Sequence, residues 1–178
     1  MVSTFRQNGS INIVVETPRG SGAKFKHDPE TGMMMLSRPL PAGILYPYDW
    51  GYIPATRAAD GDPLDAMILW DGTSYPGTIV PSRLIGVLNV EQTNVKTGLR
   101  ERNDRLFALP TIAPRFEHVR TVFDLPPRVR DELELFFVTV VAFERKDVTL
   151  LGFEGPSDAE LTLRQALTPE LKGHTTCP

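Results

Sequence analysis

Three aspartates stand within six residues of one another in the segment Asp60-Gly61-Asp62-Pro63-Leu64-Asp65. Carboxylates held this close raise one another's pKa unless a cation neutralises them, and hard cations such as Mg²⁺ prefer oxygen ligands. The spacing is therefore compatible with a divalent-metal site. The alternative is a solvated acidic turn, which the Asp60-Gly61 dipeptide favours by itself.

An EF-hand calcium loop does not fit this acidic segment. Counted from Asp60, Leu64 stands at the fifth position and Asp65 at the sixth, where an EF-hand has a glycine. Pro63 also stiffens the segment. Calcium sensing is therefore excluded.

Composition describes an ordinary globular chain. Of 178 residues, 41% are hydrophobic and 23% are charged, which predicts one domain over residues 1–178. The net charge is −3, and there is no basic run dense enough for nucleic acid or an anionic membrane. Met1–Ser10 contains no secretory signal, and no apolar run reaches the roughly 18 residues of a membrane span. We expect a cytoplasmic protein without nucleic-acid or membrane partners.

Cysteine and histidine are scarce. The only cysteine, Cys177, excludes an intramolecular disulfide and is taken as an incidental thiol. The histidines are His27, His118 and His174, too few to support a histidine-rich manganese site.

Short apolar runs separated by turn residues predict strands through the first 110 residues. The runs are Ile11–Val15, Met33–Leu36, Ala66–Trp70, Thr78–Val80, Leu84–Val90 and Leu106–Leu109.

The C-terminal part has helical patterns. Apolar residues recur at spacings of three and four between Val129 and Val141, which predicts an amphipathic helix. A second, shorter helix is expected over Ser157–Leu167, with Ser157 as its N-cap and Glu160 completing a capping box. The tail from 168 to 178 is expected to fray.

Residues upstream make the aspartate segment more specific. They are Glu16 in Val14-Val15-Glu16-Thr17-Pro18, Lys24 in Ala23-Lys24-Phe25-Lys26, Arg38 in Leu36-Ser37-Arg38, and the aromatic segment Tyr46-Pro47-Tyr48-Asp49-Trp50-Gly51-Tyr52-Ile53-Pro54. In this order, together with the aspartate segment, they closely resemble the soluble family I inorganic pyrophosphatases. The resemblance runs from about Ile11 to Pro110, with a weaker echo to Gly155.

The resemblance implies a fold and an activity. The fold is α+β and β-rich, with a five-stranded OB-like closed barrel and two flanking C-terminal helices. The activity is Mg²⁺-dependent hydrolysis of pyrophosphate to two phosphates, with several Mg²⁺ ions gathered on aspartates and Mn²⁺ or Zn²⁺ as substitute ions. Members of the family form homo-oligomers, hexamers in bacteria among them.

It also implies roles, residue by residue. The metal ligands are Asp60 and Asp65, the water-positioning carboxylate is Asp62, a hydroxyl donor is Tyr46, a carboxylate acting through metal-bound waters is Glu16, and the phosphate-binding cations are Lys24 and Arg38. Taken singly, each has a plainer interpretation. Lys24 and Arg38 would be surface charges, and Tyr46 would be part of the core.

Two residues depart from the family pattern in the first half of the chain. Lys26 stands where an acidic residue is frequent, and Trp50 stands where a tyrosine is commoner. The Trp50 indole N–H can still donate to substrate.

The second metal segment departs further. Counting back from Ala108 places Asn103 at the family's aspartate position and Arg105 at its lysine position. A one-residue bulge would instead bring in Asp104. Asp104 or Glu91 would restore the carboxylate that Asn103 lacks, and Asp104 is the ligand we expect. Arg105 keeps the positive charge and adds a bidentate fork for phosphate.

The family's tyrosine-lysine pair near the C-terminal helix is missing. Val140 and Val141 stand in its place and cannot bind phosphate. Arg145 or Lys146 would be the substitute, against the alternative that both are solvated charges at the helix end.

Two other functions remain to be considered, the first because of these departures and the second only because of the OB-type fold. One is a non-catalytic or altered-specificity relative that binds a phosphorylated ligand, although such a protein needs no water-activating carboxylate beside metal ligands. The other is an OB-type nucleic-acid binder, which the pI near 5.6 argues against.

Overall fold

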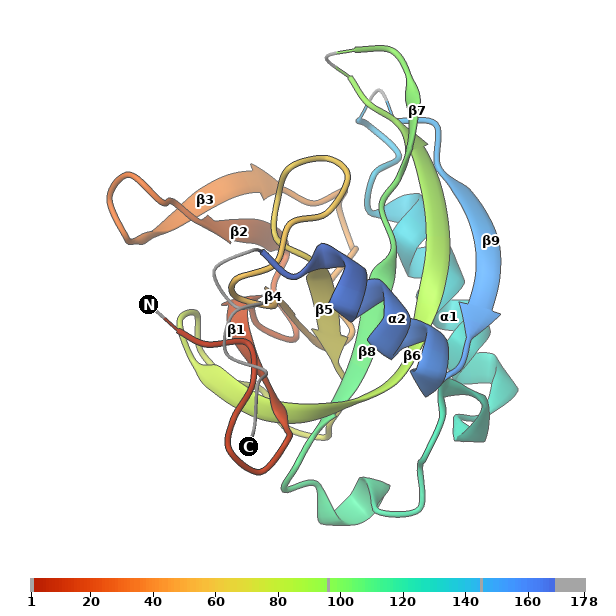
Figure 1. Cartoon of the computed structure of the whole chain (residues 1–178). Helices are drawn as coiled ribbons and strands as arrows, with labels where there is room; N and C mark the ends of the chain where they lie inside the picture. Colours follow the sequence, from red (N-terminus) through yellow and green to blue (C-terminus); the bar gives the residue numbers. More distant parts are fainter. Residues whose placement is uncertain (1, 96, 145, 169–178) are drawn as a thin grey trace.

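The computed structural model describes residues 2–95, 97–144 and 146–168 (Figure 1). Its strands are β1 (Ile11–Thr17), β2 (Ala23–His27), β3 (Met34–Pro39), β4 (Asp49–Tyr52), β5 (Asp65–Ile68), β6 (Ile79–Thr93), β7 (Arg100–Arg102), β8 (Arg105–Pro110) and β9 (Thr149–Glu154). Its α-helices are α1 (Pro127–Thr139) and α2 (Pro156–Ala166), and two short 3-10 turns are η1 (Pro114–Phe116) and η2 (Val122–Asp124). The predicted β-rich α+β class with two C-terminal helices is confirmed.

Five strands close into a ring in the order β1-β4-β5-β8-β6, and β6 returns to β1. All neighbours in the ring are antiparallel except β5 and β8, which run parallel. The predicted OB-like five-stranded barrel is therefore confirmed. The hairpin of β2 and β3 forms a separate two-stranded sheet at one side of the barrel (Figure 1).

The long curved strand β6 explains how the ring closes (Figure 1). Its first residues pair with β1, and its later residues pair with β7, β8 and β9. The register with β8 shifts between Leu84 and Gly86, which is where a bulge bends the strand. A Cβ at Gly86 would lie 2.6 Å from the Glu154 carbonyl oxygen and 2.7 Å from Val122 Cγ1, so glycine permits the close approach at this bend.

The barrel strands are buried on both faces. Along β5, Ala66 and Ile68 belong to a cluster completed by Ala159 and Leu163 of α2, whereas Met67 packs in a second cluster that includes α1. Burial on both faces explains why β5 and β8 appear in the sequence as continuous apolar runs and not as an alternation.

The second helix begins differently from the prediction. Gly155 is its N-cap, Pro156 its first residue, and no side chain caps it, so the capping box of Ser157 and Glu160 is wrong. The physical reason is that proline suits the first helical position, where its fixed φ is helical and its missing N–H is not needed.

Thr168 is the last described residue of the chain. Its backbone N–H donates to the Ala55 carbonyl oxygen at 3.1 Å. The rest of the tail predicted to fray, residues 169–178, lies outside the described part of the chain. No helix in the described part is long and apolar enough to cross a membrane.

Candidate active site

The acidic segment forms a tight loop between β4 and β5. Asp60 Oδ1 accepts the Asp62 backbone N–H at 3.1 Å, and the Ala58 N–H donates to the Asp62 carbonyl at 2.8 Å. Gly61 has a φ of 88°, a conformation that favours glycine. Asp65 is the first residue of β5, so the loop holds Asp60 and Asp62 beside the end of a barrel strand.

The β2–β3 hairpin brings cations to this loop. Lys24 and Arg38 are partners across the hairpin. The next lysine along β2, Lys26, places its Nζ 2.8 Å from Asp62 Oδ2. The hairpin therefore carries two lysines toward the acidic loop. The ion pair between Lys26 and Asp62 was not predicted from the sequence.

Lys24 and Trp50 offer donors at the same place. The partly buried Lys24 Nζ lies 5.8 Å from the centre of the Trp50 ring. Burial lowers the pKa of Lys24 to about 8, and the nearby charge of Asp65 partly opposes this shift. Trp50 is 3% exposed, and its Nε1–H meets no acceptor among the described residues. A buried donor without an acceptor beside a lysine favours an anionic ligand.

Arg105, at the start of β8, contacts the last residue of the acidic segment. The parallel pairing of β5 with β8 places it beside Asp65. Its Nη1 donates to both Asp65 Oδ2 and Asn103 Oδ1. Asp65 is thus engaged by a guanidinium on one oxygen.

Glu16 is a buried carboxyl in β1. Burial raises its pKa to about 7 and Asp65 adds to the rise, whereas the His27 N–H, Lys24 and Lys26 oppose it. Its Oε1 accepts that His27 N–H at 2.7 Å.

Tyr46 and Asp60 also have raised pKa values. Burial is the main cause for both groups. The neighbouring carboxylates Asp65 and Asp62 raise the pKa of Asp60 further. Tyr46 therefore keeps its proton at neutral pH, and Asp60 is crowded by negative charge.

The structure brings Asn103, and not Asp104, to the other site residues. The Asp104 carboxylate accepts the Val90 N–H at 2.9 Å and pairs with Arg102 at 3.0 Å. The bulge that would have rotated Asp104 inward is absent here, since the register shift of β8 against β6 lies at Leu84–Gly86. Successive side chains of an extended segment point to opposite faces, so Asn103 shares a face with Arg105.

A narrow hollow of about 40 Å³ lies beside these groups. It is lined by Lys24, Arg38, Tyr46, Trp50, Val90, Gln92, Arg105, Phe136, Phe137, Val140, Val141, Lys146 and Val148. Val140 and Val141 give it an apolar wall where the resemblance implies a tyrosine and a lysine. Lys146 lines it and pairs with Glu144 at 2.9 Å, whereas Arg145 lies outside the described residues.

Two residues in or beside the hollow were given no role in the prediction from sequence. Glu144 pairs with Arg38, whose Nη1 also donates to the Val140 carbonyl at 3.0 Å, so Arg38 is held in place. Gln92 is 4% exposed and lies on the same face of β6 as Val90. The signal for Gln92 was the two-residue period of β6, whereas nothing in the sequence pairs Glu144 with Arg38.

The donor set fits a divalent metal. Asp60, Asp62 and Asp65 supply carboxylate oxygens. Burial raises the pKa of Asp60, and the neighbouring Asp65 and Asp62 carboxylates add to the rise. Within the described residues no group of three or more His, Cys, Asp or Glu side chains is already gathered as a metal site. Two of the three aspartates are paired with cations instead: Lys26 holds Asp62, and Arg105 holds Asp65.

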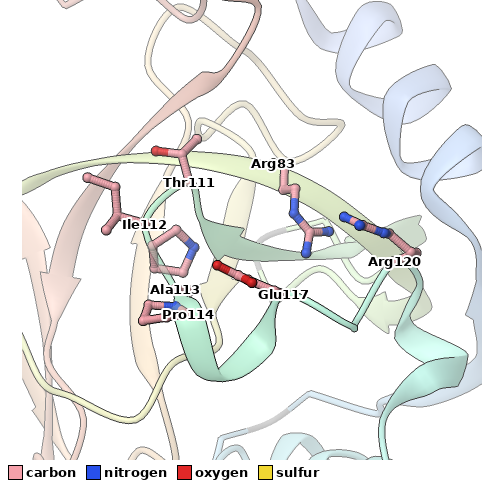
Figure 2. Close-up of a pocket in the computed structure, with 8 residues that line it drawn as sticks. Arg83, Thr111, Ile112, Ala113, Pro114, Glu117 and Arg120 are labelled. Atoms are coloured by element: carbon pink, nitrogen blue, oxygen red, sulfur yellow. The ribbon is translucent and has the colours of Figure 1, made fainter.

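A second hollow, of about 400 Å³, lies at the far end of β8 (Figure 2). Arg83, Arg120 and Glu117 line it, and Arg83 Nη2 donates to the carbonyls of Phe116 and Val119. None of the residues predicted to do chemistry lines this hollow. Its size therefore does not make it the candidate active site.

Comparison with known proteins agrees with the resemblance. The family profile described as inorganic pyrophosphatase matches residues 13–169. An inorganic pyrophosphatase of a Nostoc species is 33% identical over 89% of this chain and 90% of its own length, and that of Halalkalibacterium halodurans is 36% identical over 84% and 86%. The solved inorganic pyrophosphatase of Thermus thermophilus matches with a TM-score of 0.85 at 31% identity, over 93% of this chain and 94% of the other. That of Helicobacter pylori has a TM-score of 0.84 at 32% identity, over 93% and 96%.

Proposed function

The chain belongs to the inorganic pyrophosphatase family, and from that premise we propose how its site hydrolyses pyrophosphate to two phosphates. The observation that carries the proposal is the meeting of acidic and basic side chains at one loop. Asp65 pairs with Arg105 and interacts with Lys24, Asp60 interacts with Arg105, and Asp62 pairs with Lys26. Such a site suits phosphoryl transfer, in which catalysis is mainly positioning and charge stabilisation.

We assign the metal to Asp60 and Asp65, with Mg²⁺ as the ion and Mn²⁺ or Zn²⁺ as substitutes. When bound, the ion neutralises phosphate oxygens and lowers the pKa of an attacking water. Asp62 then orients that water and accepts its proton. Its pairing with Lys26 is solvent-exposed and is therefore easily broken.

The basic and donor groups hold the substrate. Lys24 and Arg105 bind phosphate oxygens. The Trp50 Nε1–H, which has no acceptor among the described residues, donates a hydrogen bond to the substrate. Arg38 presents its fork beside them, held by Glu144 and the Val140 carbonyl. These groups also stabilise the charge that appears on the departing phosphate.

Tyr46 and Glu16 complete the site. The raised pKa of Tyr46 keeps its hydroxyl protonated, so that it donates a hydrogen bond to a phosphate oxygen. We assign Glu16 to act through water on the metal side, with its Oε1 held by the His27 N–H.

A second candidate function rests on two observations. Arg105 is hydrogen-bonded to Asp65 and Asn103. Val140 and Val141, in addition, offer no donors to phosphate. Both features favour a relative that binds a phosphorylated ligand without fast turnover. Asp62 argues against it, because binding alone needs no proton acceptor.

The cellular setting is part of the proposal. We place the protein in the cytoplasm as one domain that assembles into a homo-oligomer, with a hexamer as the expected form. The net charge of −3 supports the absence of nucleic-acid and membrane partners.

The test is phosphate release from pyrophosphate by the purified chain, with Mg²⁺ and then with Mg²⁺ chelated. Rapid release that stops on chelation is the expected result. A folded protein that releases no phosphate in Mg²⁺ would refute hydrolysis and favour the binding function.

A further inference from the structure

The Arg105 guanidinium occupies a place among the carboxylates that a metal ion would otherwise take. One guanidinium nitrogen, Nη1, donates to both Asp65 Oδ2 and Asn103 Oδ1. The side chains of Arg105 and Asp65 are 12% and 21% exposed, so the pair is largely shielded from water. The guanidinium also lies 5.5 Å from the centre of the Trp50 ring, which fixes its position further.

The other ion pair of the site is of a different kind. The side chains of Lys26 and Asp62 are 40% and 60% exposed. Exposed pairs add little stability, whereas breaking a shielded pair leaves an unpaired charge in a poorly solvated place. The Lys26 pair is therefore the more easily broken of the two, and Arg105 stays where it is when a divalent ion binds at Asp60 and Asp65.

The charges of the site limit how many ions it takes. Four carboxylates act on one another and on three cations: Glu16, Asp60, Asp62 and Asp65 with Lys24, Lys26 and Arg105. One negative charge is left uncompensated. A first divalent ion makes the site positive, and a second would bind against that charge and against the fixed guanidinium.

We propose that Arg105 is a built-in cation that replaces a divalent metal ion between Asp65 and Asn103, so that the substrate-free site binds a single divalent ion. This ion is held by Asp60 and by the Asp65 oxygen that Arg105 leaves open. The inference rests on the proposed function for the identity of the site. It assigns to Arg105 a role in setting the metal count, in addition to the phosphate contact.

The test counts metal ions and does not depend on turnover. Mn²⁺ is titrated calorimetrically into the full chain without pyrophosphate, for the wild type, Arg105→Gln and Arg102→Gln. Arg102 is the matched control, because it pairs with Asp104 outside the site. We expect one Mn²⁺ per chain for the wild type and for R102Q, and two for R105Q. Two or more ions in the wild type, or an R105Q isotherm that superimposes on the wild type, would overturn the inference.

A second measurement needs no variant, in case R105Q does not fold. Anomalous diffraction from wild-type crystals soaked in Mn²⁺ should give one peak at Asp60 and Asp65, with Arg105 still bonded to Asn103. A peak between Asp65 and Asn103, with Arg105 displaced, would contradict the inference.

Phosphate release by the wild type separates this inference from the function. A chain that releases phosphate and binds two resting Mn²⁺ ions retains the function and loses the inference. A chain that binds one Mn²⁺ and releases no phosphate loses the function and retains the inference.

Discussion

Replacing Glu16 with glutamine should stabilise the metal-free protein. Glu16 is 7% exposed, and its Oε1 accepts the His27 backbone N–H at 2.7 Å. Glutamine keeps the shape of the side chain and an oxygen for this hydrogen bond but removes the negative charge. The variant therefore isolates the cost of a buried charge that the site retains for function.

The magnitude follows from the pKa of this carboxyl. Burial raises the pKa of Glu16 from 4.5 to about 7 in the folded protein. The folded state then binds the proton more tightly than the unfolded state, so the free energy of unfolding falls as the pH rises from 4.5 to 7 and is level above 7. At about 1.4 kcal/mol per unit of pKa, ionisation of Glu16 lowers the free energy of unfolding of the wild type by about 3 kcal/mol at pH 8 and by less than about 1 kcal/mol at pH 5. E16Q is free of this loss.

The assay is equilibrium unfolding in guanidinium chloride with a metal chelator, at pH 8 and pH 5. E16Q should unfold at higher denaturant than the wild type at pH 8, and the two should nearly coincide at pH 5. Glu160→Gln is the matched control, because Glu160 is an exposed helix residue paired with Arg164. It should change stability by less than about 0.5 kcal/mol at either pH. An E16Q protein no more stable than the wild type at pH 8, or equally stabilised at both pH values, would refute the reasoning.

Three further substitutions test the substrate groups and the barrel. Lys24→Met should raise the KM for pyrophosphate about 10- to 100-fold, because a hydrogen bond from a charged group contributes about 1.5–3 kcal/mol; an unchanged KM in initial-rate measurements would exclude Lys24 from the substrate site. Trp50→Phe removes the unpartnered indole N–H and should lower kcat/KM about 2- to 10-fold, whereas a variant with unchanged kcat/KM would show that this donor does not reach the substrate. Gly51→Ala should lower the free energy of unfolding by more than about 2 kcal/mol in denaturant titration, because the new Cβ would lie 2.1 Å from the Val14 carbonyl oxygen; wild-type stability would contradict the close strand packing.

Much of the barrel was predictable because its strands are buried on both faces. The runs that became β5, β6 and β8 are apolar for that reason. The hairpin strand β2 escaped the same criterion, since Lys24 and Lys26 alternate with Phe25 and every residue of the strand is only partly buried. The strand β4 also escaped, because it begins with the buried Asp49, which accepts hydrogen bonds from Arg19 and Trp70.

The candidate site was partly predictable for a similar reason. Asp60, Asp62 and Asp65 are close in sequence, so a tight loop already brings them together. The choice between Asn103 and Asp104 depends instead on the register of β8 against β6, and a one-residue change reverses the side chain that faces inward. The pairing of Arg38 with Glu144 joins residues far apart in the chain, and charge alone does not select that partner.

The most direct measurement is phosphate release from pyrophosphate in Mg²⁺ by the wild type and by Asp65→Asn. Asparagine keeps an acceptor for Arg105 and removes the charge assigned to the metal. We predict that the wild type releases phosphate and that D65N does so about 100-fold more slowly or less, with a cooperative unfolding transition that shows an intact fold. A folded D65N protein that releases phosphate at the wild-type rate would contradict the assignment of hydrolysis to this site.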